Sequence, residues 1–414
     1  MTDQRQRNIL NQMLDFTKSR EHCVLALQVL EELVNQINPS SRCSLLFSFP
    51  ERSKVNETKT AIQFRDSNLM NIIGLAFNML TDTYQADDAT VGTPELRMKL
   101  FQYSLQLLLR CLSFDCRMSG SEMTSDNLPV MLLPESWITN ILTDDHMSLL
   151  FNMYRSRSPL TRSYRRCASP ITTLVVEVLL WMWSSPYMDS YSYSSGGSTC
   201  EIAFNGILSI LSDSYGLNDT DTVHVFCQLL DRIMVRLSQT PHENISCIRR
   251  YVDPFVPQIV QLGLPFTQTI LSQYMTYPNT LLYLLKFWVH IIYIQNRLGS
   301  SLFPEVAGKS LKVVELYVQS HVNSADVFVE DRSDDPLNAM EGWTEELACV
   351  GKLVRVTMDE GVKLLTTMWD NLYKDYSVCL LVSCYLERLP HGHHDASLRQ
   401  LRQPAALPHH AQGV

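Results

Sequence analysis

The feature that most constrains this chain is a broad apolar face on the segment 94–112, which reads PELRMKLFQYSLQLLLRCL. Leucine and aromatic side chains recur there with the period of an α-helix that buries one face. Thr93 and Pro94 open the segment with a helix-capping side chain and a proline placed where its missing N–H costs little. A helix of this kind is marginal by itself, so the fold must supply neighbours that cover it.

The rest of the chain supplies such neighbours, because nearly every other apolar segment also has helical periodicity. The expected helices are 3–19, 21–37, 69–81, 134–142, 144–154, 170–183, 200–215, 221–239, 248–262, 265–275, 279–297, 303–322, 337–357 and 359–376. We expect Asp66 and Ser67 to cap the helix that begins near residue 69, and Pro254 and Pro257 to kink or break the segment 248–262. No Asn-Gly or Asp-Gly turn lies between alternating segments, so strands are not predicted.

The sequence therefore predicts an all-α fold. Helix pairs recur at a spacing of roughly 40 residues, which is typical of an α-solenoid of HEAT-like helical hairpins. A compact bundle of many helices is the alternative. Residues 1–376 are predicted to form the solenoid, and 377–414, rich in His, Pro, Ala and Gln, a divergent and partly disordered tail. The longer loops are expected near 116–133, 155–168, 184–199 and 323–336.

Charge and cysteine usage narrow the class of protein. The net charge of −9, from 43 acidic against 34 basic residues, argues against a nucleic-acid-binding protein. The 11 cysteines are scattered singly, as in a cytosolic or nuclear protein with reduced, buried thiols. The start has no apolar secretory signal, and the longest apolar runs fall short of the about 20 residues that span a membrane. We therefore expect no membrane insertion.

No catalytic, cofactor or metal site is expected. Glycine-rich phosphate loops and the HExxH zinc motif do not occur. His224 and Cys227 lie three residues apart, but the apolar residues around them favour a core cysteine over a catalytic pair. The tail histidines offer a loose metal site as an alternative to a disordered segment, and the second is favoured. They are His391, His393, His394, His409 and His410.

Two charged clusters are candidates for binding a partner. The basic cluster is Arg155, Arg157, Arg162, Arg165 and Arg166, and it suits an acidic partner, phosphate groups or RNA, or a solvated loop. The segment 326–346 is strongly acidic and holds a single basic residue, Arg332. Concentrated like charge often marks a docking surface for a basic protein, although a solvated loop leading into a helix N-terminus would look similar. The candidate partner-binding residues, called the acidic segment below, are Asp326, Glu330, Asp331, Asp334 and Asp335.

A series of short motifs resembles the exportin-7 (Ran-binding protein 16) family of the importin-β superfamily. They are FRDSNL at 64–69, RCLSFD at 110–115, PESW at 134–137, VFCQLL at 225–230, NTLLYLLKFW at 279–288 and DDPL at 334–337. Their order and spacing carry the resemblance, since no motif is specific alone. The marker residues are Phe64, Arg65, Asp66, Ser67, Cys111, Leu112, Phe114, Asp115, Pro134, Ser136, Trp137 and Trp288.

The resemblance implies a HEAT-repeat superhelix that acts as a nuclear transport receptor. Such an exportin binds the GTP form of the GTPase Ran and protein cargo, contacts nuclear pore proteins, and shuttles between nucleus and cytoplasm. The DDPL match places the acidic segment in a loop of the kind through which superfamily members contact Ran. The chain is shorter than family members and is expected to be a fragment or a truncated product without the repeats that grip Ran. A HEAT-repeat scaffold with no dependence on Ran is the alternative.

Overall fold

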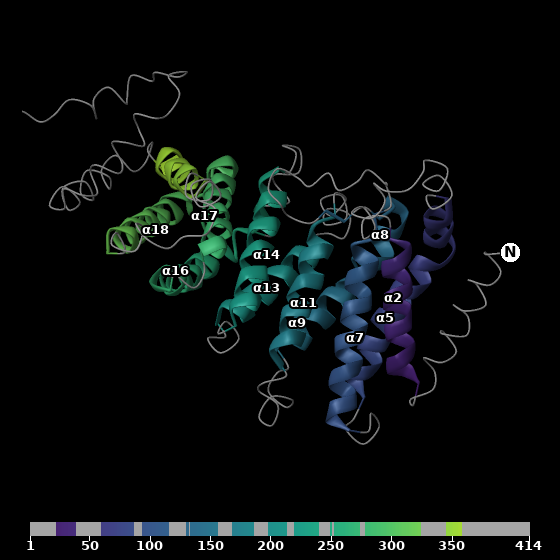
Figure 1. The fold of residues 1–414 in the computed structure, drawn as a ribbon. Coiled ribbons are helices and arrows are strands. Elements are labelled where there is room, and N and C mark those ends of the chain that lie inside the picture. Colours follow the sequence, from purple (N-terminus) through teal and green to yellow (C-terminus); the bar gives the residue numbers. More distant parts are fainter. Residues whose placement is uncertain are drawn as a thin grey trace, which may run out of the picture. The chain divides into compact units, whose positions relative to one another are not determined.

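Helices form every regular element in the part of the chain that the computed structural model describes (Figure 1). The described residues are 22–38, 59–86, 93–115, 130–131, 133–155, 168–185, 198–212, 219–239, 249–250, 252–273, 278–323 and 345–357. The chain divides into two compact units, Met1–Val362 and Lys363–Val414, and all of these residues belong to the first. The tail predicted at 377–414 therefore lies outside the described residues, and the boundary predicted near residue 376 stays a prediction.

The helices form two rows, and the chain alternates between them. Row one contains α2 (Cys23–Ile37), α7 (Pro94–Leu112), α11 (Ala168–Trp183), α14 (Thr220–Gln239) and α17 (Pro278–Leu298). Row two contains α5 (Met70–Gln85), α9 (Asp144–Arg155), α13 (Ser198–Ser212), α16 (Val256–Ser272) and α18 (Phe303–Asn323). Each helix packs on the members before and after it in its own row, and cross-row pairs such as α5 with α7 and α9 with α11 close the layers. The predicted all-α solenoid of helical hairpins is confirmed.

Helices of one row run parallel, as repetition of a hairpin requires. Between α14 and α17, Nδ1 of His224 lies 3.0 Å from the Thr280 hydroxyl near the two N-terminal ends. Near the C-terminal ends, Arg297 donates to the carbonyl of Ser238 at 2.6 Å. In row two, Thr199 of α13 donates to Asp144 of α9 at 2.8 Å, and Arg155 of α9 donates to Ser209 of α13 at 3.1 Å.

The apolar helix predicted to begin at Pro94 and to end within 111–115 is α7, and its predicted cap is confirmed. The Thr93 hydroxyl accepts a hydrogen bond from the Leu96 N–H at 3.2 Å, and Pro94 occupies the first turn. Its apolar face buries residues including Phe101, Leu105 and Leu108. The helix contacts α2, α5 and α11, so it has the neighbours on several sides that its sequence demands.

The expected cap at Asp66 and Ser67 is wrong. The chain is helical without interruption from residue 59 to residue 85, and these two residues lie in a π-helical turn, η2 (Arg65–Leu69). The wider turn keeps Phe64 and Leu69 buried at its two ends while its polar residues face outward. Asp66 therefore pairs with Arg65 at 2.6 Å instead of capping a helix.

The break expected before Pro265 is also absent. The segments predicted as helices 248–262 and 265–275 meet in one helix, α16, which begins at Val256 and contains Pro265. Residues on both sides of the proline, including Val260, Phe266 and Ile270, are buried. Their burial against neighbouring helices, among them α13, α14 and α18, outweighs the one backbone hydrogen bond that Pro265 cannot make. The break expected at Pro254 and Pro257 is confirmed: residues 253–255 form a turn, and α16 begins at Val256 with Pro257 in its first turn.

The two short helices predicted after α7 are present as α8 (Glu135–Ile141) and α9. No described helix has the length and apolarity that crossing a membrane would take. Residues 345–357 form a last described helix, which corresponds to the end of the helix predicted at 337–357.

Close packing of α9 on α13 leads to a stability prediction. A Cβ atom added at Gly206 of α13 would overlap the ring of Phe151 of α9, whereas a Cβ at Gly74 of α5 would meet open space. We expect Gly206→Ala to lower the free energy of unfolding by about 1–3 kcal/mol. Gly74→Ala should raise it by up to about 1 kcal/mol, because alanine favours a helix.

Urea titrations followed by circular dichroism at 222 nm measure both variants. The two substitutions add the same methyl group to a helix, so their opposite signs isolate the overlap with Phe151. Equal shifts of the two transition midpoints would contradict the packing of α9 on α13.

Candidate partner-binding surface

The acidic segment lies outside the described residues, but the helices on both sides of it are described. α18 leads into it and ends at Asn323, and the helix 345–357 follows it. Of the basic cluster, the structure describes Arg155 alone, which donates to the Ser209 hydroxyl between α9 and α13. The tail histidines lie outside the described residues as well. The binding roles of these clusters stay predictions.

The last two acids of the run 326–346 are described, and both hold helices together. Glu345 lies 3.9 Å from the Lys286 ammonium of α17. Glu346 is 3% exposed and accepts a hydrogen bond from the Tyr317 hydroxyl of α18 at 3.1 Å. The helix 345–357 is thereby fixed to α17 and α18. The Glu346 carboxylate is therefore part of the packing, whereas Glu345 is 58% exposed and its distant ion pair adds little to it.

The seam between α14 and α17 brings together a polar set that the sequence did not predict. Asp231, 1% exposed, has Oδ1 at 3.7 Å from Nε2 of His290, and Nδ1 of His290 lies 3.4 Å from the Ser238 hydroxyl. The Ser238 hydroxyl donates to the carbonyl of Val235 at 2.7 Å, which is a shorter contact than the one to His290. Serine, histidine and aspartate meet here, but the hydroxyl proton is held by the backbone. The set joins two helices and is not arranged as an activated nucleophile.

The pair His224 and Cys227 is also structural. Cys227 is fully buried, and burial raises the pKa of its thiol far above the usual range. His224 contacts Thr280 and Gln228, and burial lowers the pKa of its imidazole. The prediction of a core cysteine is confirmed. Among the described residues, no group of three or more His, Cys, Asp or Glu side chains comes close enough to hold a metal ion.

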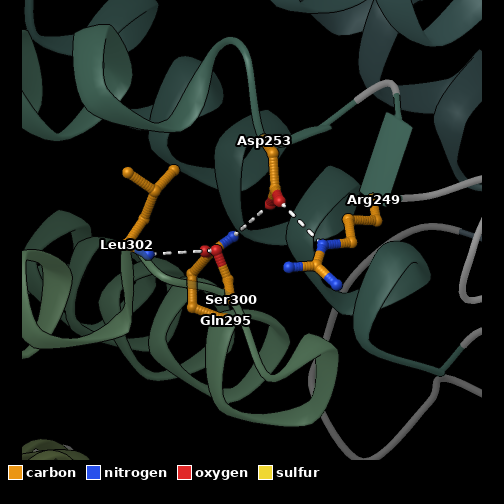
Figure 2. Close-up of polar contacts among 5 residues, drawn as sticks. All are labelled: Arg249, Asp253, Gln295, Ser300 and Leu302. Atoms are coloured by element: carbon orange, nitrogen blue, oxygen red, sulfur yellow. Dashed lines mark hydrogen bonds and ion pairs between the residues drawn. The ribbon is translucent and has the colours of Figure 1, made fainter.

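A polar network at the end of α17 fixes the path of the chain into α18 (Figure 2). Asp253 contacts Arg249 at 3.4 Å and accepts from Gln295 at 3.5 Å. The Ser300 hydroxyl accepts from the N–H of Leu302 at 3.2 Å, just after Gly299 turns the chain with a φ of 55°. A left-handed residue of this kind ends a helix without strain when it is glycine. The network joins the residues before α16 to the turn that begins α18.

The first two motifs meet at the end of α7 through one aromatic residue of each. The rings of Phe64 and Phe114 lie 6.2 Å apart, and Cys111 and Leu112 are buried beside them in α7. Asn38 closes this end of α2 on α7. Its amide donates to the carbonyl of Ser113 at 3.3 Å, and its side-chain oxygen accepts from the N–H of Asp115 at 3.1 Å.

The third motif opens α8. The N–H of Trp137 donates to the carbonyl of Pro134 at 3.0 Å, the Trp137 ring is half-buried, and Ser136 is exposed. α8 and α7 both pack on α5, so α5 is the common neighbour of the first three motifs.

The marker Trp288 belongs to α17 and is buried against α16. Its indole N–H donates to the Thr267 hydroxyl at 2.9 Å, and that hydroxyl donates to the carbonyl of Gly263 at 2.7 Å. The markers are thus structural residues at two places. Among the marker residues, Asp66, Ser67 and Ser136 are exposed, and Arg65, Pro134 and Trp137 are half-buried.

Comparison with known proteins confirms the resemblance predicted from the motifs. The chain is 24% identical to Ran-binding protein 16 of Drosophila melanogaster over 373 residues, which is 89% of this chain and 32% of that protein. It is 23% identical to human Ran-binding protein 17, over 87% of this chain and 30% of that protein. It is 25% identical to exportin-7-B of Xenopus laevis, over 90% of this chain and 32% of that protein.

These similarities are broad in this chain and partial in the relatives. The chain spans about a third of the length of the curated relatives that it matches. No protein-family model matches it. The similarity therefore covers nearly all of the helices described above, and it leaves most of each relative without a counterpart in the sequence given.

A half-buried histidine, His146, packs between α5 and α9 and is expected to make the stability depend on pH. The His146 ring stacks on Phe77 with centroids 3.7 Å apart, and its Nδ1 lies 3.0 Å from the carbonyl of Ile141. Burial lowers the pKa of His146, and the Ile141 carbonyl and Asp145 offset part of that effect. Because the unfolded histidine keeps a pKa near 6.5, the unfolded state binds more protons than the folded state below that pH. Stability from this residue is present above about pH 6.5 and falls as the pH drops.

We expect the free energy of unfolding to fall between pH 7.5 and pH 5.5, with at most about 1.4 kcal/mol of the loss due to His146. His146→Phe keeps the stacking on Phe77 but loses the contact with the Ile141 carbonyl, so the variant should be less stable than the wild type at pH 7.5. Because phenylalanine cannot titrate, the variant should also lose less of its free energy of unfolding on acidification. Urea midpoints at the two pH values measure both proteins. The same loss in the wild type and the variant would show that His146 does not titrate in this range.

Proposed function

We propose that this chain is part of a nuclear transport receptor, an exportin that binds the GTP form of Ran together with protein cargo. In this proposal it shuttles between nucleus and cytoplasm through contacts with nuclear pore proteins. One observation carries the proposal: 87–90% of the chain is similar to proteins named exportin-7 and Ran-binding protein 16 or 17. The two alternating rows of helices support it, because such arrays present long surfaces to protein partners.

The proposal gives the acidic segment a specific role. The segment follows α18, and its later neighbours Glu345 and Glu346 hold the helix 345–357 against α17 and α18. The described helices before and after the segment are packed in the array, and surface segments between packed helices are common sites of partner binding. We propose that Asp326, Glu330, Asp331, Asp334 and Asp335 meet basic residues on the surface of Ran.

The second candidate is a HEAT-repeat scaffold that binds proteins without dependence on Ran. The partial coverage favours it, since the chain spans only 30–32% of the relatives whose names refer to Ran or to export. The same helical rows would serve either function, because a fold of this kind does not by itself fix a partner. The two candidates differ in whether binding depends on the nucleotide that Ran carries.

The first functional prediction concerns that nucleotide. We expect the chain to capture Ran loaded with a non-hydrolysable GTP analogue and to capture far less Ran loaded with GDP. Purified chain immobilised on beads and incubated with Ran in each state, followed by quantification of bound Ran, measures this. Equal capture in both states would favour the scaffold, and no capture in either state would contradict the Ran part of the proposal.

The second functional prediction concerns the acidic segment. We expect the charge reversal Asp331→Lys, Asp334→Lys and Asp335→Lys to weaken binding of the GTP form by about tenfold or more. Each exposed ion pair contributes about 0.2–1 kcal/mol, and about 1.4 kcal/mol is tenfold in affinity. Because the interaction is between exposed charges, wild-type binding should also weaken as salt rises.

A matched variant controls for net charge. Glu95, Glu135 and Glu201 are exposed and lie in the first turns of α7, α8 and α13, so reversing them changes the net charge equally. Reversal there also opposes the helix dipole, so this control should lose at least as much helix stability as the test variant. Isothermal titration with GTP-loaded Ran compares the three proteins. Equal affinities for the test variant and the wild type would show that the acidic segment is only a solvated linker.

A further inference from the structure

From residue 174 to its end at Trp183, α11 has one narrow stripe of side chains that its neighbours leave open. The helix packs between α7 and α14 in its own row and on α9 of the other row. Leu174, Glu177 and Trp181 are half-buried, whereas the other residues from 175 to 183 are buried. At 100° per residue the three half-buried side chains fall within about 60° of one another. They therefore form a single face, called the α11 stripe below.

The carboxylate of the α11 stripe lacks a partner. Glu177 is the one charged residue of α11, and it makes no hydrogen bond or ion pair within the described part of the chain. Burial raises its pKa, repulsion by Asp221 of α14 adds to this effect, and Arg110 of α7 offsets part of it. Arg110 also lies 3.5 Å from Glu31 of α2, so its charge is shared with a second carboxylate. A half-buried charge without a direct partner destabilises the fold unless another molecule supplies one.

The Trp181 ring adjoins this carboxylate. Side chains of an α-helix lean toward its N-terminus, so the ring of Trp181 lies over the turn that contains Glu177. Of the residues that the structure describes, none stacks an aromatic ring on Trp181 or places a cation over it. Tryptophan attracts cations over its face more strongly than the other aromatic side chains do. The α11 stripe thus offers a carboxylate and a ring side by side, with apolar surface at Leu174.

A comparable arrangement on α17 is filled by the chain itself. The Lys286 ammonium lies 5.8 Å from the centre of the Tyr283 ring, one turn away on the same helix. The same ammonium lies 3.9 Å from the Glu345 carboxylate of the helix 345–357. A cation there meets a ring and a carboxylate at the same time. On α11 the ring and the carboxylate are present, and no described residue supplies the cation.

We propose that the α11 stripe binds an arginine side chain of a partner protein. The planar guanidinium can donate two parallel hydrogen bonds to the Glu177 carboxylate and stack on the Trp181 ring, while its carbon stem lies along Leu174. A lysine ammonium would match the charge but neither planar contact, so it fits less well. Asp221 nearby is exposed and forms no ion pair with a described residue, which adds to the attraction for a cation. The contact needs neither Ran nor the acidic segment, so it goes beyond the proposed function.

The test uses the full chain labelled with fluorotryptophan. The chain has six tryptophans, and Trp181→Phe identifies the fluorine NMR signal of position 181. The probe is a short amidated peptide with two arginines, and its matched control carries citrulline, which keeps the planar shape without the charge. We expect the arginine peptide to shift the Trp181 signal saturably and to bind about fivefold more tightly than the citrulline peptide. Absence of a saturable shift, or equal affinities for the two peptides, would overturn the proposal.

Glu177→Gln isolates the contribution of the carboxylate, because it removes the charge and keeps the size. Glu201→Gln, at an exposed position in the first turn of α13, is the matched control. We expect Glu177→Gln to weaken binding of the arginine peptide about fivefold and the control to leave it unchanged. The urea midpoint of Glu177→Gln should equal or exceed that of the wild type, since the unpartnered charge is gone. Unchanged affinity contradicts the proposal, and so does a lowered midpoint, which would make Glu177 part of the packing.

Light scattering of the wild type and of Glu177→Gln distinguishes a partner protein from a second copy of this chain. We expect both proteins to have the mass of a monomer at the concentrations of the titration. A wild-type dimer that Glu177→Gln dissociates would place an arginine of the second copy on the α11 stripe and overturn the assignment to a separate partner.

Discussion

The structure depends on one constraint: a helix with apolar side chains on more than one side must be covered on more than one side. α7 meets it by packing against α2 and α11 within its row and against α5 in the other row. The same requirement passes from each helix to the next, because the neighbour that covers one face brings another face of its own. Repetition in two rows satisfies it with helices of ordinary length. The energy of the fold is thus spread along the array as interfaces between neighbours.

Polar contacts near the helix ends set how the apolar faces meet. Asn38 binds the backbone at the end of α7 through both its amide nitrogen and its oxygen. Arg297 holds the carbonyl of Ser238 between α14 and α17, and Asp253 ties the chain before α16 to the end of α17. Burial is not directional, so it would tolerate sliding of one helix along another. Hydrogen bonds at both ends of a pair do not tolerate sliding, and they keep the helices of each row parallel and in register.

The helices could be predicted from the sequence wherever the local signal and the packing agree. Thr93 and Pro94 start α7 as expected, because capping depends on residues within one turn. The errors at Asp66 and at Pro265 have a common cause. Asp66 lies in a continuous helix because burial of Phe64 and Leu69 outweighs its preference for a capping position. Pro265 lies inside α16 because burial of neighbours such as Phe266 outweighs the preference of proline to end a helix. A sequence rule cannot weigh that burial without knowing which helices are neighbours.

The same reasoning explains what the sequence indicated about the site. The set formed by Asp231, Ser238 and His290 was not predictable, since each residue is a polar position on its own amphipathic helix and only the pairing of α14 with α17 brings them together. The acidic run 326–346 could be recognised from the sequence, but the sequence did not show which of its acids contact neighbouring helices. Glu345 and Glu346 bind Lys286 and Tyr317 and belong to the packing, whereas the earlier acids stand between two anchored helices.

That division has a physical consequence for where a solenoid of this kind can carry function. Phe114 and Trp288 belong to the motifs that resemble the exportin-7 family, yet both are buried and hold neighbouring helices together. In an array where each repeat contacts only its neighbours, a connection between two fixed helices can gain charge without disturbing any other interface. Mutual repulsion among its carboxylates is relieved by water and salt, or by a basic partner. Partner binding at the acidic residues between α18 and the helix 345–357 would therefore compete little with the packing of the described helices.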